Sequence, residues 1–320
     1  MTIPVTISVI VCTHNRSASL GKTLASLALS AVPTHVEWEV LVVDNNSTDH
    51  TRQCAEDFCR RYPARFRYLF EGQAGKSYAL NAGIHAARGD ILAFTDDDVL
   101  VDVDWLYKLA SSLSDARYAG AGGRTFPEKG FMPPPWFPRD PRCASPPFAL
   151  FDRGAEPCEL SDPPFGNNMA YRRAMFEKHG GFRNDLGPRF GSKAPQKSED
   201  SEFGLRLLCQ GEKFRYEPSA IVYHAVPESR VQRSYFLSWW FDKSRADIRA
   251  VGIPSPARWR VAGIPIYLFR RLAVWTLRWM VTTKAPARFE CKINVWSKAG
   301  EIIECYRMWR EGKPVGGKTA

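Results

Sequence analysis

The sequence lacks the glycine motifs of the most common nucleotide-binding folds. The segment CTHNRSASLGK, which follows the first strand-like run, contains no G-x-G-x-x-G, and this argues against a dinucleotide-dependent dehydrogenase. The GKS of EGQAGKS lacks the earlier glycine of a P-loop and follows a third strand pattern rather than a first. The glycine-rich loop with a basic residue that a sugar nucleotidyltransferase would carry after its first strand is also missing.

Metal-binding cysteine patterns and long uncharged apolar runs are absent as well. The eight cysteines include no CxxC pair and no Cys/His metal spacing, which indicates reduced, packed thiols in a reducing compartment. No cleavable signal peptide is visible, because MTIPVTISVIVCTHN runs directly into a strand pattern. The apolar stretch IPIYLFRRLAVWTLRWMVTT carries three arginines, whereas a spanning helix needs about 20 predominantly apolar residues with few charges.

What the first 110 residues do contain is an alternation of strand and helix patterns. The strand patterns are VTISVIVCT, WEVLVVDNNSTD, RFRYLFE and DILAFTD, and the helix patterns between them are LGKTLASLAL, TRQCAEDFCRRY and KSYALNAGIHAA. Such alternation predicts a mostly parallel sheet covered by helices, in which ligands bind at the carboxyl ends of the strands. Polar residues cluster at those ends: Thr13, His14, Asn15 and Arg16; Asp44, Asn45 and Asn46; Asp96, Asp97 and Asp98.

The last of these groups is the most informative. Three adjacent carboxylates, Asp96, Asp97 and Asp98, end the apolar run of DILAFTD. Charges crowded at the end of a buried strand repel each other and lose solvation unless something positive holds them. A solvated acidic loop is the ordinary alternative, but the preceding strand is too apolar for it, so the triplet predicts a cation or ligand site.

Five segments, in this order, resemble family 2 glycosyltransferases: ISVIVCTHNR, VLVVDNNSTD, GKSYALNAGIHAARGDILAFTDDD, GNNMAYRR and SEDSEFGLRLL. The resemblance covers roughly residues 5–226. It implies an inverting enzyme of the GT-A fold that uses a nucleotide-activated sugar. In the family's D-x-D arrangement the last Asp binds Mg²⁺ or Mn²⁺ and the first lies near the ribose, which implies these roles for Asp98 and Asp96. Asp97 would face the nucleotide, and His224 would complete the metal site or remain structural.

The resemblance also implies a donor site. Asp44 occupies the position that accepts a hydrogen bond from the base, and a carboxylate suits both uracil and guanine. Thr13 and His14 end the first strand, and His14 stands where family members often stack an aromatic ring on the base. We expect a UDP-sugar as the donor. Further donor-binding residues implied by the resemblance are Arg16, Asn46, Lys76, Asn81 and Asn168, although Lys76 could also be a solvated lysine.

The catalytic base is implied by the segment SEDSEFGLRLL. An inverting transfer needs one general base to take the proton from the acceptor hydroxyl. The family places this role on Asp200, with Glu199 as the neighbour that orients or tunes it. An ordinary interpretation also exists, because acids are favoured at a helix N-terminus and Ser198 could cap this helix.

Two further regions allow competing interpretations. Residues 120–165 are rich in Pro, Gly and aromatic residues, which predicts little regular structure; Trp136, Phe137 and Phe148 would pack on sugar faces or cover the core. Residues 229–320 hold 18 Lys and Arg against 6 Asp and Glu, and seven of the ten Trp. A stripe of Leu268, Leu272, Trp275 and Trp279, with the arginines opposite, predicts an interfacial helix on an anionic membrane, or else a helical subdomain or dimer contact.

These inferences give a single prediction for the chain. We expect a GT-A type α/β fold with a nucleotide-sugar half over 1–110, an acceptor half over 111–228 and a basic helical tail over 229–320. The function would be metal-dependent inverting transfer to a glycan or lipid-linked acceptor on the cytoplasmic face of a membrane, without a nucleic-acid partner. A polyprenyl-phosphate sugar synthase and a non-catalytic sugar-nucleotide or glycan-binding module are the alternatives.

Overall fold

The computed structural model describes residues 6–189, 197–253 and 259–312. The chain forms two compact units: one of Met1–Lys129, Ala149–Phe190 and Glu199–Ala225, the other of Gly130–Phe148, Gly191–Ser198 and Val226–Ala320. The second unit begins close to the boundary predicted at residue 228, and it also includes the segment 130–148. The division of residues 1–228 into two functional halves stays a prediction.

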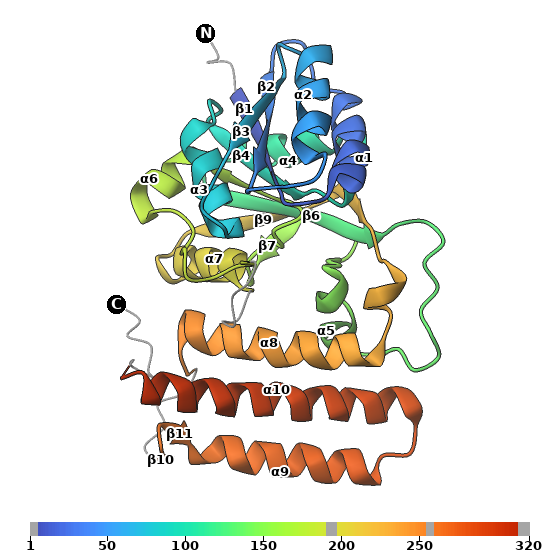
Figure 1. Ribbon diagram of the computed structural model, residues 1–320, viewed down its shortest axis with the longest axis vertical. Coiled ribbons are helices and arrows are strands. Elements are labelled where there is room, and N and C mark those ends of the chain that lie inside the picture. The colour runs from blue at the N-terminus through green and yellow to red at the C-terminus, as the bar shows by residue number, and fades with distance from the viewer. Residues whose placement is uncertain (1–5, 190–196, 254–258, 313–320) are drawn as a thin grey trace. The chain divides into compact units, whose positions relative to one another are not determined.

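The first unit is built on one large mixed sheet with helices around it (Figure 1). Its elements are β1 (Thr6–Thr13), α1 (Ser17–Ala28), β2 (Glu37–Asp44), α2 (Thr51–Arg61), β3 (Phe66–Phe70), α3 (Lys76–Ala86), β4 (Ile91–Asp96), β5 (Val99–Val101), α4 (Trp105–Ser111), β6 (Tyr118–Pro127), β7 (Cys158–Leu160), β8 (Met169–Arg172), α6 (Arg173–His179), α7 (Glu199–Cys209) and β9 (Lys213–His224). The strand order is β3-β2-β1-β4-β8-β6-β9-β5, with β7 also paired to β9. The strands β3, β2, β1 and β4 are parallel, as predicted, and β8 is antiparallel to both of its neighbours.

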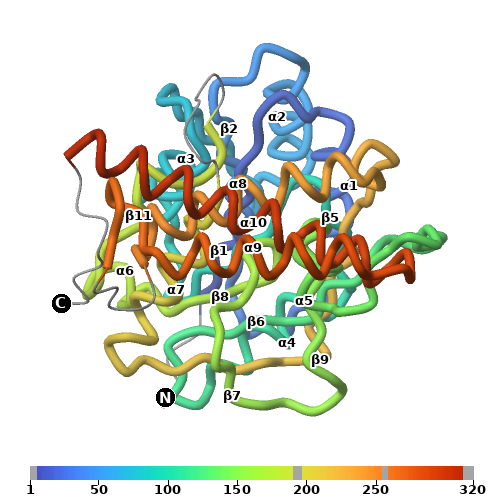
Figure 2. Tube along the Cα trace, turned by 90° about the horizontal axis from the view of Figure 1, so that it is seen from below, coloured from blue at the N-terminus to red at the C-terminus, as the bar shows by residue number. Residues whose placement is uncertain are grey.

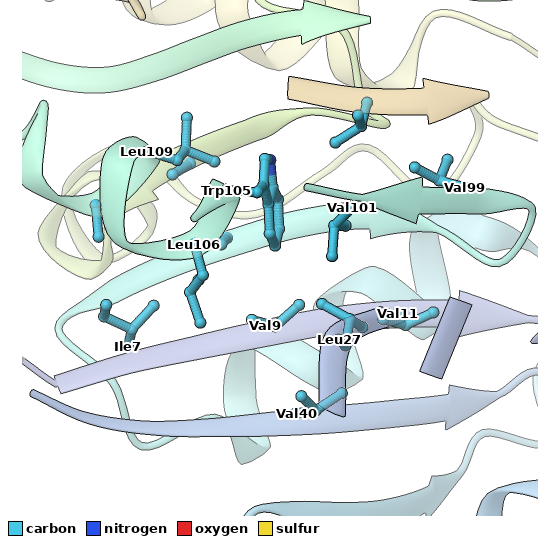
Figure 3. Close-up of a cluster of buried hydrophobic side chains, with 14 of the residues drawn as sticks. Ile7, Val9, Val11, Leu27, Val40, Val99, Val101, Trp105, Leu106 and Leu109 are labelled. Carbon is cyan, nitrogen blue, oxygen red and sulfur yellow. The ribbon is translucent and has the colours of Figure 1, made fainter. Parts of the chain in front are cut away.

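Alternation along β1 explains why this sheet is buried on both faces. Ile7, Val9 and Val11 point to one face, where they pack with Leu27 of α1 and Trp105 of α4 (Figure 3). The residues between them point the other way, and Ile10 joins a second core with Leu41, Val43 and Ala79. Successive side chains of a strand point to opposite faces, so near-continuous apolar strands fit only a sheet covered on both sides.

The second unit is helical. Its elements are α5 (Pro141–Ala144), the 3₁₀ turns η1 (Pro146–Phe148) and η2 (Glu228–Arg230), α8 (Arg233–Val251), β10 (Arg260–Val261), β11 (Ile264–Pro265), α9 (Ile266–Val281) and α10 (Ala285–Arg310). The helix α10 packs on both α8 and α9 and lies between them in Figure 1, and Figure 2 shows the same helices from below. The α8–α10 contact contains a buried ion cluster, in which Glu304 of α10 accepts from Arg245 at 3.1 Å and from Arg249 at 2.6 Å.

The segment predicted to have little regular structure differs from that expectation at its start. Residues 118–127 form the regular strand β6, which pairs with β8 and β9. The aromatic residues that follow pack inside the second unit: Trp136 lies 5.1 Å from the ring of Phe289, and Phe148 lies 5.1 Å from the ring of Phe236. Phe137 stacks on Phe148. Of the two interpretations of these side chains, packing is therefore the one that the structure supports.

The predicted stripe on α9 faces the protein rather than solvent, which corrects the prediction that it meets a membrane. Leu268 is 1% exposed and belongs to a core with Cys305 and Met308 of α10. Trp279 lies on the same side, where the ammonium group of Lys292 from α10 sits 5.4 Å from its ring. The stripe therefore forms the α9–α10 contact. No helix in the part of the chain that the structure describes is long and apolar enough to cross a membrane.

Candidate active site

Parallel register brings the polar residues at the strand ends into one row. Thr13 of β1 pairs with Asp44 of β2, and Cys12 of β1 pairs with Asp96 of β4. The carboxyl ends of β1, β2 and β4 thus meet at the same sheet edge. This confirms the arrangement that the strand and helix pattern predicts for such a sheet.

The acid triplet meets a histidine from a distant strand. Val99 of β5 pairs antiparallel with His224 at the end of β9, and this pairing holds the imidazole beside Asp98, with Nε2 3.3 Å from Oδ1. One ligand atom from each of Asp96, Asp98 and His224 lies within 4.8 Å of the others. His224 is 2% exposed, and its Nδ1 has no hydrogen-bond partner among the described residues. Two carboxylates and an imidazole at this spacing fit a divalent cation such as Mn²⁺.

An arginine lies against the same acids. The guanidinium of Arg16 contacts Asp98 at 2.7 Å and Asp97 at 3.9 Å. Asp97 is 8% exposed, and burial together with the neighbouring Asp98 carboxylate raises its pKa to about 7, although Arg16 and the hydroxyl of Thr13 work in the opposite direction. Three adjacent carboxylates thus lie close enough to disfavour each other's charge, which a bound cation would relieve.

Lys76, the first residue of α3, connects this cluster to α7. Its ammonium group lies 2.7 Å from Asp96 and 3.7 Å from Glu199. Burial opposes its charge, but Asp96 and Glu199 hold the pKa of Lys76 well above its usual value. Burial raises the pKa of Glu199 to about 7; Lys76 opposes this shift and Asp200 adds to it. The alternative of a solvated lysine is therefore wrong, because Lys76 is paired with two acids.

Asp200 lies in the first turn of α7, and two backbone N–H groups hold its carboxylate. Its Oδ2 accepts from the N–H of Gly166 at 2.9 Å, and its Oδ1 accepts from the N–H of Ser201 at 2.7 Å. A Cβ at Gly166 would come within 2.9 Å of Oδ2, so a side chain there would shift the Asp200 carboxylate. The hydroxyl of Ser198 donates to Asp247, and its predicted role as the cap of α7 stays a prediction. Asp200 shares one pocket with Lys76, Glu199 and Asp96, and the same pocket is lined by Cys12, Leu80, Phe94, Thr95, Gly166 and Met169.

The predicted base-recognition residues lie at the ends of β1 and β2. Asp44 is buried, and its carboxylate accepts from the hydroxyl of Tyr68 at 2.9 Å and from the N–H of Ser47 at 3.0 Å. Nδ1 of His14 lies 2.7 Å from the carbonyl oxygen of Asn45, which fixes the imidazole beside this loop. Asn46 is exposed with a positive φ of 63°.

Two residues that were predicted to bind the sugar donor have structural roles instead. Both amide hydrogens of Asn168 are donated to backbone carbonyls, those of Arg124 and Ala220, and its oxygen accepts from the indole N–H of Trp105. This side chain is 1% exposed. Asn81 is used in a similar way, because its carboxamide donates to the carbonyl of Phe182 and accepts from the N–H of the same residue. Each asparagine therefore uses its amide in hydrogen bonds within the fold instead of presenting it to a ligand.

One residue that organises the site was grouped with the polar residues at the strand ends but was given no role. Asn45 is 4% exposed, donates to the carbonyls of Glu71 and Gln73 and accepts from the N–H of Gly75. It thereby fixes the loop that positions Lys76 at the start of α3. Its place directly after a strand-ending Asp was the only sequence signal.

The fold is that of the GT-A glycosyltransferases. Mannosyltransferase PcManGT from Pyrobaculum calidifontis, solved in complex with GDP-Man and Mn²⁺, matches over 98% of this chain and 77% of its own, with a TM-score of 0.57 and 18% identity. The S. aureus TarS fragment 1–349 in complex with UDP matches over 96% of this chain and 92% of its own, with a TM-score of 0.52 and 17% identity.

The sequence profile of the family described as Glycosyl transferase family 2 matches residues 8–180, and the chain belongs to this family. Succinoglycan biosynthesis protein ExoM of Rhizobium meliloti (strain 1021) is 30% identical over 232 residues, which are 72% of this chain and 68% of that protein. Glucosyl-dolichyl phosphate glucuronosyltransferase of Haloferax volcanii is 29% identical over 245 residues, which are 73% of this chain and 74% of that protein. The predicted family, fold and enzyme class are therefore confirmed.

Proposed function

We propose that this glycosyltransferase is metal-dependent and inverting, and that it moves a sugar from a nucleoside diphosphate onto a hydroxyl of a glycan or lipid-linked acceptor. The observation that carries the proposal is the position of Asp96, which belongs both to the Asp96–Asp98–His224 cluster and to the pocket that contains Asp200. A leaving-group site and a base site are thus adjacent, as a transfer reaction requires.

The leaving-group site would use Asp96, Asp98 and His224 as cation ligands. A mixed set of carboxylate and imidazole ligands favours Mn²⁺ over Mg²⁺, because Mg²⁺ prefers oxygen ligands alone. When bound, the cation would neutralise the charge that builds on the diphosphate. Arg16, whose guanidinium already lies 2.7 Å from Asp98, is close enough to contribute a second positive charge to a diphosphate there.

The base site would use Asp200. Two backbone N–H groups fix its carboxylate, so the remaining lone pairs keep one orientation toward the pocket. Asp200 would take the proton of the acceptor hydroxyl as that oxygen attacks the anomeric carbon. Glu199, with a pKa of about 7, would change its charge near neutral pH and so tune the field at Asp200. Phe94 and Met169 line the same pocket and would exclude water from it.

The donor base would bind beside Asp44. The carboxylate retains lone pairs beyond those used by Tyr68 and Ser47, so it can accept an N–H from a base. PcManGT was solved with GDP-Man and the TarS fragment with UDP, and both bases offer such an N–H. We favour a UDP-sugar. The ring of His14, held by Asn45, would stack on the base.

The names of two relatives support the proposed acceptor class. One acts in succinoglycan biosynthesis, and the other is a glucuronosyltransferase whose name includes a dolichyl phosphate. A glycan on a lipid carrier is consistent with both, and we place the enzyme at the inner face of the cytoplasmic membrane. A polyprenyl-phosphate sugar synthase differs only in its acceptor, whereas a non-catalytic binding module would have no use for Asp200.

A panel of nucleotide sugars tests the proposal. Thermal unfolding with Mn²⁺ should identify the donor, because a ligand at one hundred times its Kd adds about 2.7 kcal/mol to the stability. Hydrolysis of that donor should then require Mn²⁺ and stop when EDTA is added. Stabilisation without any hydrolysis or transfer would indicate a binding module, and hydrolysis that persists in EDTA would contradict the metal dependence.

A further inference from the structure

The outer side of α9 exposes apolar side chains along the length of the helix. While Leu268 and its neighbours face α10, several large residues on the other side remain in contact with solvent. Their exposed fractions are 48% for Ile266, 42% for Phe269, 42% for Val274, 61% for Leu277, 64% for Met280 and 76% for Val281. A surface helix normally has polar residues opposite its buried stripe, so this face calls for a specific explanation.

Helical spacing joins these residues into one continuous strip. Phe269, Ala273 and Leu277 follow one another at intervals of four, and Met280 continues the row three residues later. Arg270 lies within this face. Arg271 and Arg278, seven residues apart, form its border, and they stack over the rings of Tyr267 at 5.3 Å and Trp275 at 5.0 Å. α9 contains no acidic residue over Ile266–Val281.

An exposed tryptophan lies beside the start of this strip. Trp259 is 69% exposed, and its carbonyl oxygen accepts from the N–H of Ile266 at 3.1 Å, which fixes it beside the first turn of α9. Tryptophan prefers the headgroup level of a bilayer, where its ring is partly buried and its N–H is hydrated. The strip therefore combines an apolar centre, a basic border and an aromatic end.

We propose that this outer face of α9, formed by Ile266, Phe269, Ala273, Leu277, Met280 and Val281, lies in the headgroup region of an anionic phospholipid surface. Charge complementarity selects this partner, because the arginines at the strip have no acid on α9 to pair with and would meet lipid phosphates. A second copy of the chain fits less well, since a symmetric contact between two α9 helices would bring their arginines together. This proposal rests on the membrane location proposed above. It assigns the membrane contact to the face of α9 opposite the stripe predicted from the sequence.

Vesicle flotation with the full chain tests the proposal. The probes are vesicles of phosphatidylcholine alone and of phosphatidylcholine mixed with phosphatidylglycerol. The protein should float with the anionic vesicles, bind the neutral ones less and partly dissociate in high salt, because the Debye length falls from about 10 Å at 0.1 M to about 3 Å at 1 M. Absence of flotation with anionic vesicles would overturn the proposal.

Matched variants locate the binding face. Leu277→Gln with Met280→Gln removes two exposed apolar side chains from α9, and the partition coefficient should fall at least about tenfold. The control, Leu29→Gln with Met132→Gln, removes side chains that are 73% and 82% exposed elsewhere and should leave flotation unchanged. Equal losses in both variants would contradict an α9-specific surface. All four positions are exposed, and circular dichroism would verify that each variant is folded.

The three arginines of this face and its border are tested in the same way. Neutralising Arg270, Arg271 and Arg278 to Gln should lower anionic-vesicle binding roughly fivefold for each charge and leave neutral-vesicle binding nearly unchanged. If the face joins two copies instead, the protein without lipid would sediment as a dimer that Leu277→Gln with Met280→Gln dissociates, and flotation would not respond. Donor hydrolysis by the wild-type protein without vesicles tests the proposed function separately. Absence of hydrolysis would contradict the proposed function but not the proposed lipid surface.

Discussion

A buried carboxyl at the active site should make the stability of this enzyme depend on pH in a way that one substitution removes. Glu199 begins α7, is 5% exposed and has a pKa of about 7, against 4.5 for an ordinary glutamate. Burial is the main cause; the Asp200 carboxylate adds to the shift, and Lys76 opposes it. We predict that Glu199→Gln makes the protein more stable relative to the wild type as the pH rises.

The sign and size follow from proton linkage. The folded pKa is higher than the unfolded one, so Glu199 favours the folded state fully below pH 4.5, where it is protonated in both states. That contribution is lost as the pH rises through 7, because the unfolded state then gains more from ionisation. A shift of this size corresponds to about 3 kcal/mol. Glutamine stays neutral, so the difference in unfolding free energy between variant and wild type should increase by about 3 kcal/mol between pH 4.5 and pH 8.

Urea unfolding at a series of pH values measures this difference. Titrating groups that do not interact with Glu199 cancel, because they are present and unchanged in both proteins. Glu156→Gln is the control, since this carboxyl is exposed and its removal should leave a flat difference curve. A flat curve for Glu199→Gln as well would show that Glu199 ionises in the fold as easily as in water, and its proposed role in tuning Asp200 would then have no basis.

Three further outcomes are expected. Asp98→Ala should abolish Mn²⁺-dependent binding of a nucleoside diphosphate in calorimetry, because the cation loses a carboxylate; an unchanged affinity would remove Asp98 from the metal site. Asp200→Asn should keep donor affinity and lower the transfer rate about 100- to 10,000-fold in single-turnover kinetics, and a collapse of donor binding would instead assign Asp200 to the donor site. Glu304→Ala should destabilise the second unit by about 3–5 kcal/mol in urea, because Arg245 and Arg249 lose their common partner, and a loss below about 1 kcal/mol would show that water already solvates these guanidinium groups.

The strands β1 to β4 and the helices α1 to α3 could be predicted because their signals are local, whereas β5 and α4 were not predicted. The apolar runs that end at Thr13, Asp44 and Asp96 predict strands whose carboxyl ends meet at one edge, and the parallel pairing of β1 with β2 and β4 places them there. The approach of His224 to Asp98 followed only from the family resemblance, because it depends on the pairing of β5 with a strand more than a hundred residues away.

Amide side chains near the site could not be assigned from sequence. Asn45 and Asn46 are adjacent and follow the same strand, yet one is 4% exposed and fixes a loop, and the other is exposed with a φ of 63°. Strand alternation ends at Asp44, so no periodicity indicates which of the two turns inward. The partners of Asn168 come from α4, β6 and β9, and only the folded arrangement shows that its hydrogen bonds are already used.

The helix α9 shows what helical periodicity can predict and what it cannot. The spacing of Leu268, Leu272, Trp275 and Trp279 correctly predicts that these residues share one face. It cannot say what that face contacts, because the opposite face of the helix is apolar too. A helix that is apolar on both sides offers two faces for burial, and the position of α10 decides which of them packs inside the protein. Since α10 already covers the predicted stripe, any membrane contact of α9 must use the face that contains Phe269, Leu277 and Met280.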